Sequence, residues 1–203
     1  MKYVKLNRLL EWVYEITRPV GKEGDVEFVF HLEKIDVTVG VGSYGRIHVY
    51  SLQPRGKIVI GNYTSISEIT VLIGGDHHFG ITTYPFKAKY FKREVEEDNQ
   101  PVKGIKIGND CWIGQDTTLL DGVTIGDGSV IGARSVVARD IPPYSIAVGN
   151  PAIVIRQRFS NEEIRLLLQC QWWNIPKQQL LKQIDKLYSS NVQEFVTSLK
   201  NKH

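Results

Sequence analysis

Two adjacent histidines, His77 and His78, stand in the stretch GGDHHFGITTYPF between small flexible residues and an aromatic and proline cluster. Imidazole titrates at about pH 6.5, so a histidine can take up a proton from a reacting group near neutral pH. One of the two could therefore be the working group of an enzyme, or both could provide only packing and polarity in a loop. The choice depends on the elements that hold this stretch in place.

A repeat of six residues dominates the chain around this stretch. Aliphatic residues, usually followed by glycine, occupy every sixth position at Ile107, Ile113, Leu119, Ile125, Ile131 and Val137. The same register holds at Ile60, Ile66 and Leu72, and more faintly at Val41 and Ile47. The period of six matches neither the 3.6-residue period of a helix nor the two-residue alternation of a free-standing strand. A β-sandwich with turns at similar spacing is the alternative, but the six-residue regularity would then be accidental. It does match a chain that turns a corner every six residues, so that three short strands form one coil of a triangular prism and the coils stack as parallel strands.

The N-terminal residues predict two elements that lead into this prism. Residues 1–18 place apolar side chains on one helical face, and the pattern ends at Arg18 and Pro19. Residues 26–32 alternate enough to read as a strand. We therefore expect a packing helix followed by a strand.

The C-terminal residues predict a group of helices. Ser160 and Glu163 form a capping box that opens the first helix. A second apolar stripe contains Leu180, Ile184 and Leu187, and a third helix is expected from Asn191. Trp172 and Trp173 are expected to pack against the end of the prism. We expect these helices to cap its open end, because a repeat fold needs its terminal coil covered.

Residues 78–104 break the six-residue register. The hexads stop at His77 and resume near Ile107, so the intervening chain must leave the prism as an excursion. Long loops inside compact repeat folds usually carry function. With its aromatic residues and the charged run KREVEEDNQ, this excursion is expected to form a lid or a pocket wall. The alternative is an arm that packs against another subunit, and both descriptions can hold together.

The pattern of an aliphatic residue, glycine, two variable residues and a small residue resembles the hexapeptide-repeat acyltransferases. The resemblance covers about residues 36–158 and is strongest to the xenobiotic acetyltransferase branch, meaning type B chloramphenicol and streptogramin acetyltransferases, with related polysaccharide O-acetyltransferases. It is carried by IGNYTSIS, GGDHHFGITTYPF, the segment from IGNDCWIG to VGNPA, and RQRF. It implies an all-β fold class: a left-handed parallel β-helix, here with the excursion loop and an α-helical C-terminal cap.

The resemblance also implies roles for individual residues. In that branch a histidine seven residues before the tyrosine of Tyr-Pro-Phe is the general base, and the matching residue is His77; His78 stands where arginine is more usual. Tyr84 and Phe86 would line the acceptor pocket. The cosubstrate would be acetyl-CoA, held by Trp112, Gln115, Ala133, Ala138, Arg139 and Arg156, with the two arginines at its phosphates. The family forms trimers with active sites between neighbouring subunits, so we expect a homotrimer.

Two features of the sequence bear on the identity of the acceptor. The stretch FGITTYPF lacks the usual basic and acidic pair after the base, and VGSYGRIHVY with GKIVIGNYTSI is more similar to the polysaccharide-modifying relatives. We therefore expect a sugar hydroxyl as acceptor. The alternatives are an antibiotic hydroxyl or the amine of an amino sugar.

Two hypotheses other than acetyl transfer are a zinc-dependent carbonic anhydrase and a non-catalytic solenoid. The β-helical carbonic anhydrases bind zinc through three histidines, two of them spaced HxxxxH, but the five histidines of this chain include no such pair. Cys111 and Cys170 also lack CxxC spacing, so no metal is expected. A non-catalytic solenoid would have no need to break its register at His77.

The bulk properties agree with a small-molecule enzyme. The chain has 203 residues, 42% hydrophobic and 23% charged, with a formal net charge of +3. The basic residues are scattered, which favours a small anionic ligand over nucleic acid. Without a membrane-length apolar span or a signal peptide, a cytoplasmic protein with no integral membrane segment is expected. The expected organisation is residues 1–35 as a lead-in, 36–158 as the β-helix with its loop at 78–104, and 159–203 as C-terminal helices.

Overall fold

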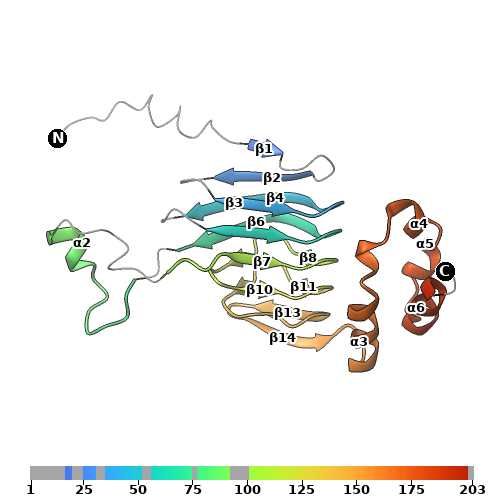
Figure 1. Ribbon diagram of the computed structural model, residues 1–203. Helices are drawn as coiled ribbons and strands as arrows, with labels where there is room; N and C mark the ends of the chain where they lie inside the picture. Colours follow the sequence, from blue (N-terminus) through green and yellow to red (C-terminus); the bar gives the residue numbers. More distant parts are fainter. Residues whose placement is uncertain are drawn as a thin grey trace.

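The computed structural model describes residues 17–19, 25–30, 35–51, 56–74, 77–91 and 101–200. Its strands are β1 (Thr17–Pro19), β2 (Asp25–Phe30), β3 (Asp36–Val39), β4 (Tyr44–Ser51), β5 (Lys57–Ile60), β6 (Ser65–Ile73), β7 (Ile105–Ile107), β8 (Trp112–Ile113), β9 (Thr118–Leu119), β10 (Thr124–Ile125), β11 (Val130–Ile131), β12 (Val136–Val137), β13 (Ser145–Gly149) and β14 (Ala152–Gln157). Its helices are α2 (Phe86–Phe91), α3 (Asn161–Cys170), the 3-10 helix η2 (Trp172–Asn174), α4 (Lys177–Leu181), α5 (Ile184–Leu187) and α6 (Val192–Lys200). Figure 1 shows the strands stacked in coils, with helices on two opposite sides.

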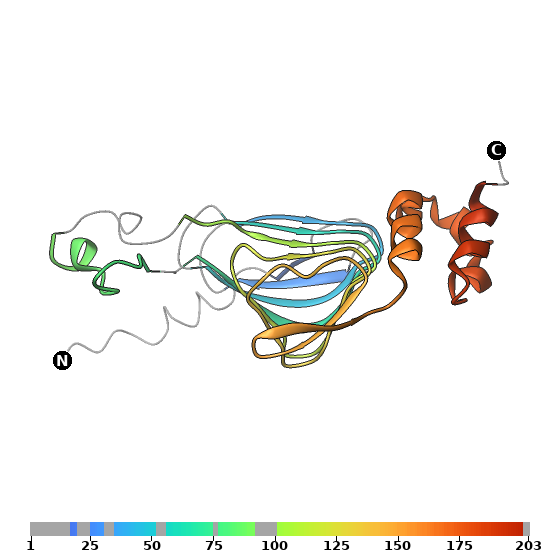
Figure 2. The same ribbon diagram turned by 90° about the horizontal axis from the view of Figure 1, so that it is seen from below.

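Parallel strands form the three faces of the prism. The first face contains β3, β5, β7 and β10. The second contains β8, β11 and β13 with the first halves of β4 and β6, and the third contains β9 and β12 with their second halves. Figure 2 looks along the stack and shows the coils one behind another. The hexad pattern therefore correctly predicted parallel coils.

The three corners between these faces are named by what they carry. The helix corner joins the first and second faces and contains Tyr63, Asp110 and Tyr144, next to the C-terminal helices. The middle corner joins the second and third faces at Glu68 and Gln115. The loop corner joins the third and first faces, and the excursion leaves the prism there (Figure 1).

The interior is a narrow column of aliphatic side chains. All six hexad starters from Ile107 to Val137 are at most 1% exposed. Buried hydroxyls between them bond to backbone carbonyls; for example, Thr64 Oγ1 donates to Gly108 O at 2.8 Å and Thr117 Oγ1 to Gly114 O at 2.8 Å. Because each coil supplies few residues, the core has no layer thick enough to hold a buried catalytic group.

One hexad assignment was wrong. Leu72 was expected inside the prism, but Val71 and Ile73 are buried and Leu72 is only half-buried. Val71 pairs with Leu119 while Ile66 pairs with Ile113, so the middle corner is one residue shorter in this coil than in the next. Val41, also a faint match, is 45% exposed in a turn, whereas Ile47 is buried.

The N-terminal expectation is partly corrected. Thr17–Pro19 is a strand that pairs antiparallel with β2, not the end of a helix. Residues 1–16, the rest of the expected helix, lie outside the described residues. The strand expected at 26–32 is confirmed by β2, which pairs parallel with β4.

The C-terminal helices do not close the open end of the prism. They lie beside the helix corner (Figure 1), where Asn62 Nδ2 donates to Trp173 O at 3.1 Å and Tyr63 stacks on Trp172 with ring centroids 5.9 Å apart. The last coil is instead followed by β14, which folds back antiparallel on β13. The physical reason is that the corner presents large aromatic side chains for an amphipathic helix to cover.

The start of this helical group is as expected. Ser160 Oγ accepts from the backbone N–H of Glu163, and the Glu163 carboxylate accepts from the Ser160 backbone N–H at 2.9 Å, which confirms the capping box of α3. The second expected helix is broken into α4 and α5, and α6 begins beside Asn191 as expected. Trp172 and Trp173 are buried, in agreement with a packing role.

Candidate active site

His77 lies on the surface at the point where the chain leaves the loop corner. Its side chain is exposed, and its Nδ1 is 2.5 Å from the carbonyl oxygen of Thr83. A carbonyl oxygen can only accept, so Nδ1 carries the hydrogen and Nε2 keeps its lone pair. In the neutral ring, Nε2 is therefore the nitrogen that can accept a proton. The geometry therefore allows His77 to act as a base through Nε2.

The excursion beyond His77 presents aromatic side chains to solvent. Tyr84 and Phe86 meet edge to face with centroids 4.8 Å apart, and Tyr90 lies 5.8 Å from Phe86. Both Tyr84 and Phe86 are 48% exposed, and Phe79 is 76% exposed. The short helix α2 that carries the cluster has no buried residue. An apolar surface of this kind indicates a contact with a substrate or another subunit.

The residues expected to hold the cosubstrate divide between two places. Trp112, Gln115 and Ala133 are exposed on the second face and the middle corner, and the register places Arg156 below Trp112 through Val130 and Ile146. These four follow one side of the stack. Ala138 and Arg139 are exposed after β12, on the turn toward the loop corner.

One chain does not bring Trp112, Gln115, Ala133 or Arg156 to its own His77. Trp112 pairs with Ser65 at the beginning of β6, while His77 follows the other end of the same strand. Figure 1 accordingly shows β8 and the excursion with α2 on different sides of the prism. A site that needs both groups must take one of them from another copy.

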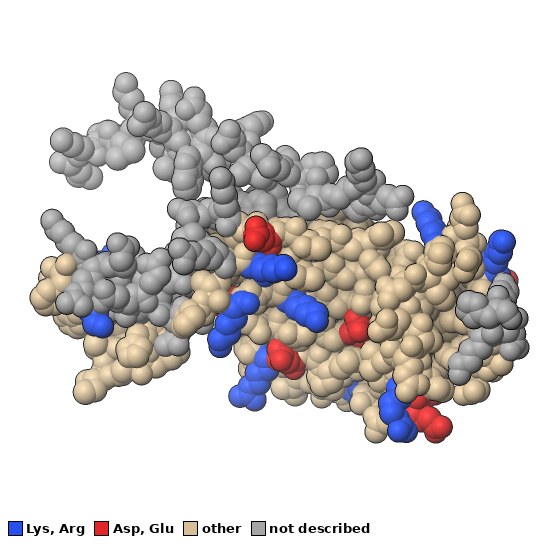
Figure 3. All heavy atoms as spheres, viewed as in Figure 1, with Lys and Arg blue, Asp and Glu red and all other residues tan. Residues whose placement is uncertain are grey.

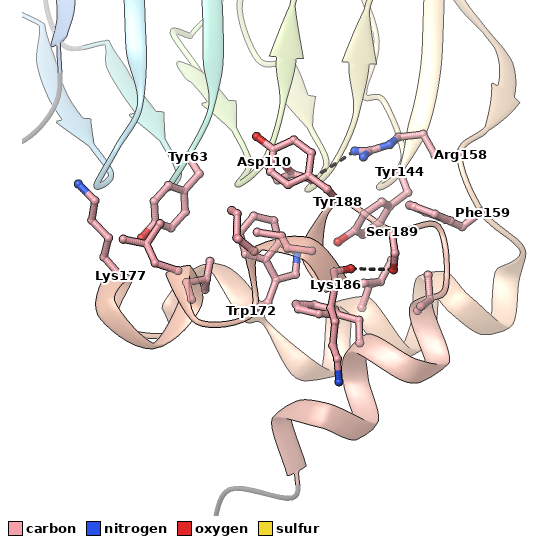
Figure 4. Close-up of a pocket in the computed structure, with 17 residues that line it drawn as sticks. Tyr63, Asp110, Tyr144, Arg158, Phe159, Trp172, Lys177, Lys186, Tyr188 and Ser189 are labelled. Atoms are coloured by element: carbon pink, nitrogen blue, oxygen red, sulfur yellow. Dashed lines mark hydrogen bonds and ion pairs between the residues drawn. The ribbon is translucent and has the colours of Figure 1, made fainter.

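A cavity of about 570 Å³ lies at the helix corner (Figure 4), and His77 is not among the residues that line it. It is lined mainly by aromatic and aliphatic residues of the corner and of the C-terminal helices. Its polar lining includes Lys177, Lys186, Ser189 and an ion pair between Arg158 and Asp110 at 3.2 Å. Arg158 also donates to Gly128 O at 2.6 Å. Burial raises the pKa of the Asp110 carboxyl, and Arg158 counteracts part of this rise. These contacts hold the segment that leads into the C-terminal helices against the prism. They bring no proton-accepting group near His77.

Other reactive groups of the described residues are unsuited to catalysis. Burial raises the pKa of the Cys111 thiol to about 12, which leaves it protonated and unreactive. Within the described part of the chain, no group of three or more His, Cys, Asp or Glu side chains is placed to hold a metal ion. The helices described there are also all too short or too polar to span a membrane.

A charged row on the middle corner was missed by the sequence-based expectations. Arg46 Nε contacts Glu27 at 2.8 Å, Arg46 Nη1 lies 3.9 Å from Glu68, and His48 Nε2 lies 2.6 Å from Glu68. The hydrogen bond with Glu27 raises the pKa of Arg46. The charged residues of this row occupy outward-facing positions of β2, β4 and β6, and these positions align only once the coils are in register.

Comparison with known proteins gives this arrangement a family. Residues 104–139 match the bacterial transferase hexapeptide family model (six repeats). The chain is 41% identical over 140 residues to a probable macrolide acetyltransferase of Lysinibacillus sphaericus, covering 66% of this chain and 78% of the relative. It is 38% identical over 155 residues to a chloramphenicol acetyltransferase of Agrobacterium fabrum, covering 70% and 73%.

A solved structure agrees with these relatives. A maltose O-acetyltransferase of Clostridium difficile 630 matches with a TM-score of 0.51 and 27% identity, covering 70% of each chain. Together, the family model, the relatives and the solved structure confirm the resemblance drawn from the hexads. The chain belongs to the hexapeptide-repeat acetyltransferases.

Proposed function

We propose that the protein transfers an acetyl group from acetyl-CoA to a hydroxyl group, with His77 as the general base. The observation that carries this is the bond between His77 Nδ1 and Thr83 O, which leaves Nε2 as the proton acceptor. As the acceptor oxygen attacks the thioester carbonyl, its proton passes to Nε2. Collapse of the tetrahedral intermediate breaks the carbon–sulfur bond, and the proton held by His77 passes to the departing thiolate. The thioester is already activated, so neither a metal nor a covalent enzyme intermediate is needed.

We further propose that the working unit is a homotrimer, with each site shared between two copies. Support comes from the separation of His77 from Trp112, Gln115 and Ala133 within one chain, and from the exposed aromatic cluster of the excursion. In a closed ring, the excursion of one copy meets the second face of the next. The left-handed winding of the coils is inferred from family membership, and residues 36–158 are taken as the catalytic unit.

Acetyl-CoA would lie along the second face of one copy. The small side chain of Ala133 leaves room for the pantetheine arm to run close to the backbone, the Gln115 amide would hydrogen-bond to the arm, and Arg156 at the lower coil would meet phosphates. Ala138 and Arg139 lie near the loop corner and would serve the same function only from a different copy. Tyr84 and Phe86 would close the site on the acceptor side. Because acetyl-CoA is a cytoplasmic metabolite, we place the reaction in the cytoplasm.

For the acceptor, we propose a sugar hydroxyl. The similarity to a maltose O-acetyltransferase supports it. A second candidate is an antibiotic hydroxyl, since two relatives carry macrolide and chloramphenicol acetyltransferase names. An amino-sugar amine is a third possibility with the same base chemistry.

The experiment is incubation of the protein with acetyl-CoA and separate acceptors, followed by mass spectrometry of the products. The acceptors are maltose, a galactoside, chloramphenicol, a macrolide and a nucleotide-linked amino sugar. Gain of one acetyl group on the sugars supports the proposal, and gain on chloramphenicol or the macrolide alone selects the second candidate. Acetyl-CoA consumption with no acetylated product in any tube would contradict the proposed function.

A further inference from the structure

The cavity at the helix corner has the size and the lining of a small-molecule site. Its volume of about 570 Å³ lies within the range of about 300–1,000 Å³ that is usual for such sites. Its buried lining includes Leu167, Trp172 and Phe195, and its exposed lining includes Leu181 and Ile184. The cavity thus combines an apolar interior with an edge that solvent reaches.

The charged side chains that line the cavity are either paired or exposed. Arg158 forms its ion pair with Asp110, and Lys186 Nζ lies 3.8 Å from a Glu194 carboxylate oxygen. Lys177 is exposed, so water can hydrate its ammonium group. Because the charges of the Arg158–Asp110 pair balance each other, the prism side of the cavity offers no net charge to a ligand.

The Tyr144 hydroxyl differs from these groups because it is buried without a partner. Tyr144 lines the cavity and is 1% exposed, and no described residue gives its hydroxyl oxygen a hydrogen bond of acceptable geometry. Figure 4 shows this side chain leaving the prism and pointing toward Trp172 and the C-terminal helices. A buried polar group without a partner is rare in folded proteins. The hydroxyl therefore indicates a hydrogen-bond partner that the chain itself does not supply.

The protonation state of Tyr144 makes this hydroxyl a donor. Burial, and to a smaller extent the Asp110 carboxylate, raises the pKa of the phenol, and Trp172 counteracts only part of this rise. The phenol is therefore protonated at neutral pH, and its O–H can donate to an oxygen of a ligand.

The surroundings of this donor select the kind of oxygen that it would meet. A carboxylate placed there would face Asp110, and burial already raises the pKa of that carboxyl. An ammonium group would face Arg158. Burying a charge without a partner is costly, whereas a neutral carbonyl oxygen only has to accept the Tyr144 hydrogen bond. The aliphatic and aromatic lining would cover the rest of such a molecule.

We propose that this cavity binds a neutral, mainly apolar molecule with a hydrogen-bond-accepting oxygen, such as a ketone or an ester, and that the Tyr144 hydroxyl holds this oxygen. The bound molecule would bridge the prism and the C-terminal helices and so stabilise the folded chain. The proposal is independent of acetyl transfer, because His77 does not line the cavity.

The test is isothermal titration calorimetry with 2-nonanone, nonanoate and nonylammonium, which share a nine-carbon chain and differ in the polar group. The ketone has no hydroxyl or amine to be acetylated, so its binding cannot be confused with turnover. It should bind at least about tenfold more tightly than either charged compound. Saturating CoA should not displace it, because the proposed CoA groove lies on the second face.

Tyr144→Phe removes the hydroxyl and keeps the ring. It should weaken 2-nonanone binding about threefold to tenfold, because one hydrogen bond is lost. The unfolding temperature of the free protein should not fall, since the hydroxyl has no partner there. Tyr188→Phe is the matched control, because Tyr188 lines the same cavity but is 84% exposed, and it should bind the ketone as the wild type does. Ile184→Trp should fill the cavity from its exposed side and abolish binding.

Four results would overturn the proposal. The first is no binding of 2-nonanone up to its solubility limit, and the second is tighter binding of nonanoate or nonylammonium. The third is displacement of the ketone by CoA, which would place it on the second face. The fourth is a Tyr144→Phe variant that binds the ketone as well as the wild type or unfolds at a lower temperature, because the hydroxyl would then be idle or already satisfied.

Discussion

The helix corner and the loop corner are built from the same coils but differ in how their side chains are used. At the helix corner, Tyr63, Asp110 and Tyr144 all adopt positive φ angles between 52° and 55°. Tyr63 stacks on the buried Trp172, and Asp110 and Tyr144 both contact the half-buried Arg158. At the loop corner, His77, Tyr84 and Phe86 are exposed.

The helix corner therefore contributes to the stability of the fold, whereas the loop corner carries the proposed catalytic residue. A narrow prism cannot bury a catalytic group, so the protein places its base on an excursion and uses the opposite corner to gain buried area. The cavity of about 570 Å³ belongs to the stabilising corner, and the proposed site becomes complete only between copies. Substitutions at the two corners should therefore affect different measurements.

The largest effect is expected at the loop corner. His77→Gln should lower kcat by about 10²–10⁴-fold, because the acceptor loses its proton acceptor. The unfolding temperature should stay unchanged, since His77 is exposed. His78→Gln is the control and should retain activity. A His77→Gln variant with wild-type kcat would contradict the assignment of catalysis to the loop corner.

Two tryptophans give the next test. Trp172 is 7% exposed and stacks on Tyr63, so Trp172→Ala should lower the free energy of unfolding by about 3–5 kcal/mol. Trp112 is 59% exposed, so Trp112→Ala should leave the unfolding transition nearly unchanged and raise KM values instead. Denaturant unfolding and initial rates of both variants check this. Equal losses of stability would remove the distinction between the helix corner and the residues of the proposed site.

The ion pair between Arg158 and Asp110 at the helix corner predicts that removing Arg158 lowers the free energy of unfolding by an amount that depends on pH. Arg158→Ala should cost about 1–3 kcal/mol at neutral pH, a range reduced because both side chains are about 30% exposed. Burial already raises the pKa of Asp110, and without Arg158 it rises further. The unpaired carboxylate destabilises the fold above that pKa, so the deficit should shrink as pH falls toward about 4. Urea unfolding at both pH values measures it, and Asp110→Asn added to Arg158→Ala should recover part of the loss. A deficit that grows on acidification contradicts this.

The smallest effect concerns the start of α3. Hydrogen bonds from the Ser160 hydroxyl and backbone lower the pKa of Glu163. A lowered folded pKa means that the contribution is present above the ordinary glutamate pKa and is lost as pH falls through the folded value. Ser160→Ala should therefore reduce stability near neutral pH and less below about pH 3. Thermal unfolding at the two pH values checks the sign.

The sequence predicted the β-helix well because its signal is repeated in every coil. Each hexad places one aliphatic residue inward, so an error at one position leaves the others intact, as at Leu72, where the middle corner is one residue shorter. The capping box was predictable because it is local. The position of the helices beside Tyr63 and Tyr144 was not, since it depends on which residues align at one corner after the coils stack.

The candidate site was predictable only in part. Residue types around His77 indicated a base, but the bond to Thr83 that fixes its tautomer depends on how the excursion folds. Contacts between copies cannot be read from hexads at all, because the pattern describes one chain.

The most direct test of the central claim, that each site joins His77 of one copy to the second face of the next, is subunit complementation. His77→Gln lacks the base, and Ala133→Trp would fill the proposed acetyl-CoA groove, so each alone should be inactive. Co-expressed with different tags and purified as mixed trimers, they should recover about one third of wild-type sites, because one of the three contacts in each mixed ring joins an intact loop to an intact face. Mixed assemblies no more active than either parent would contradict the shared site.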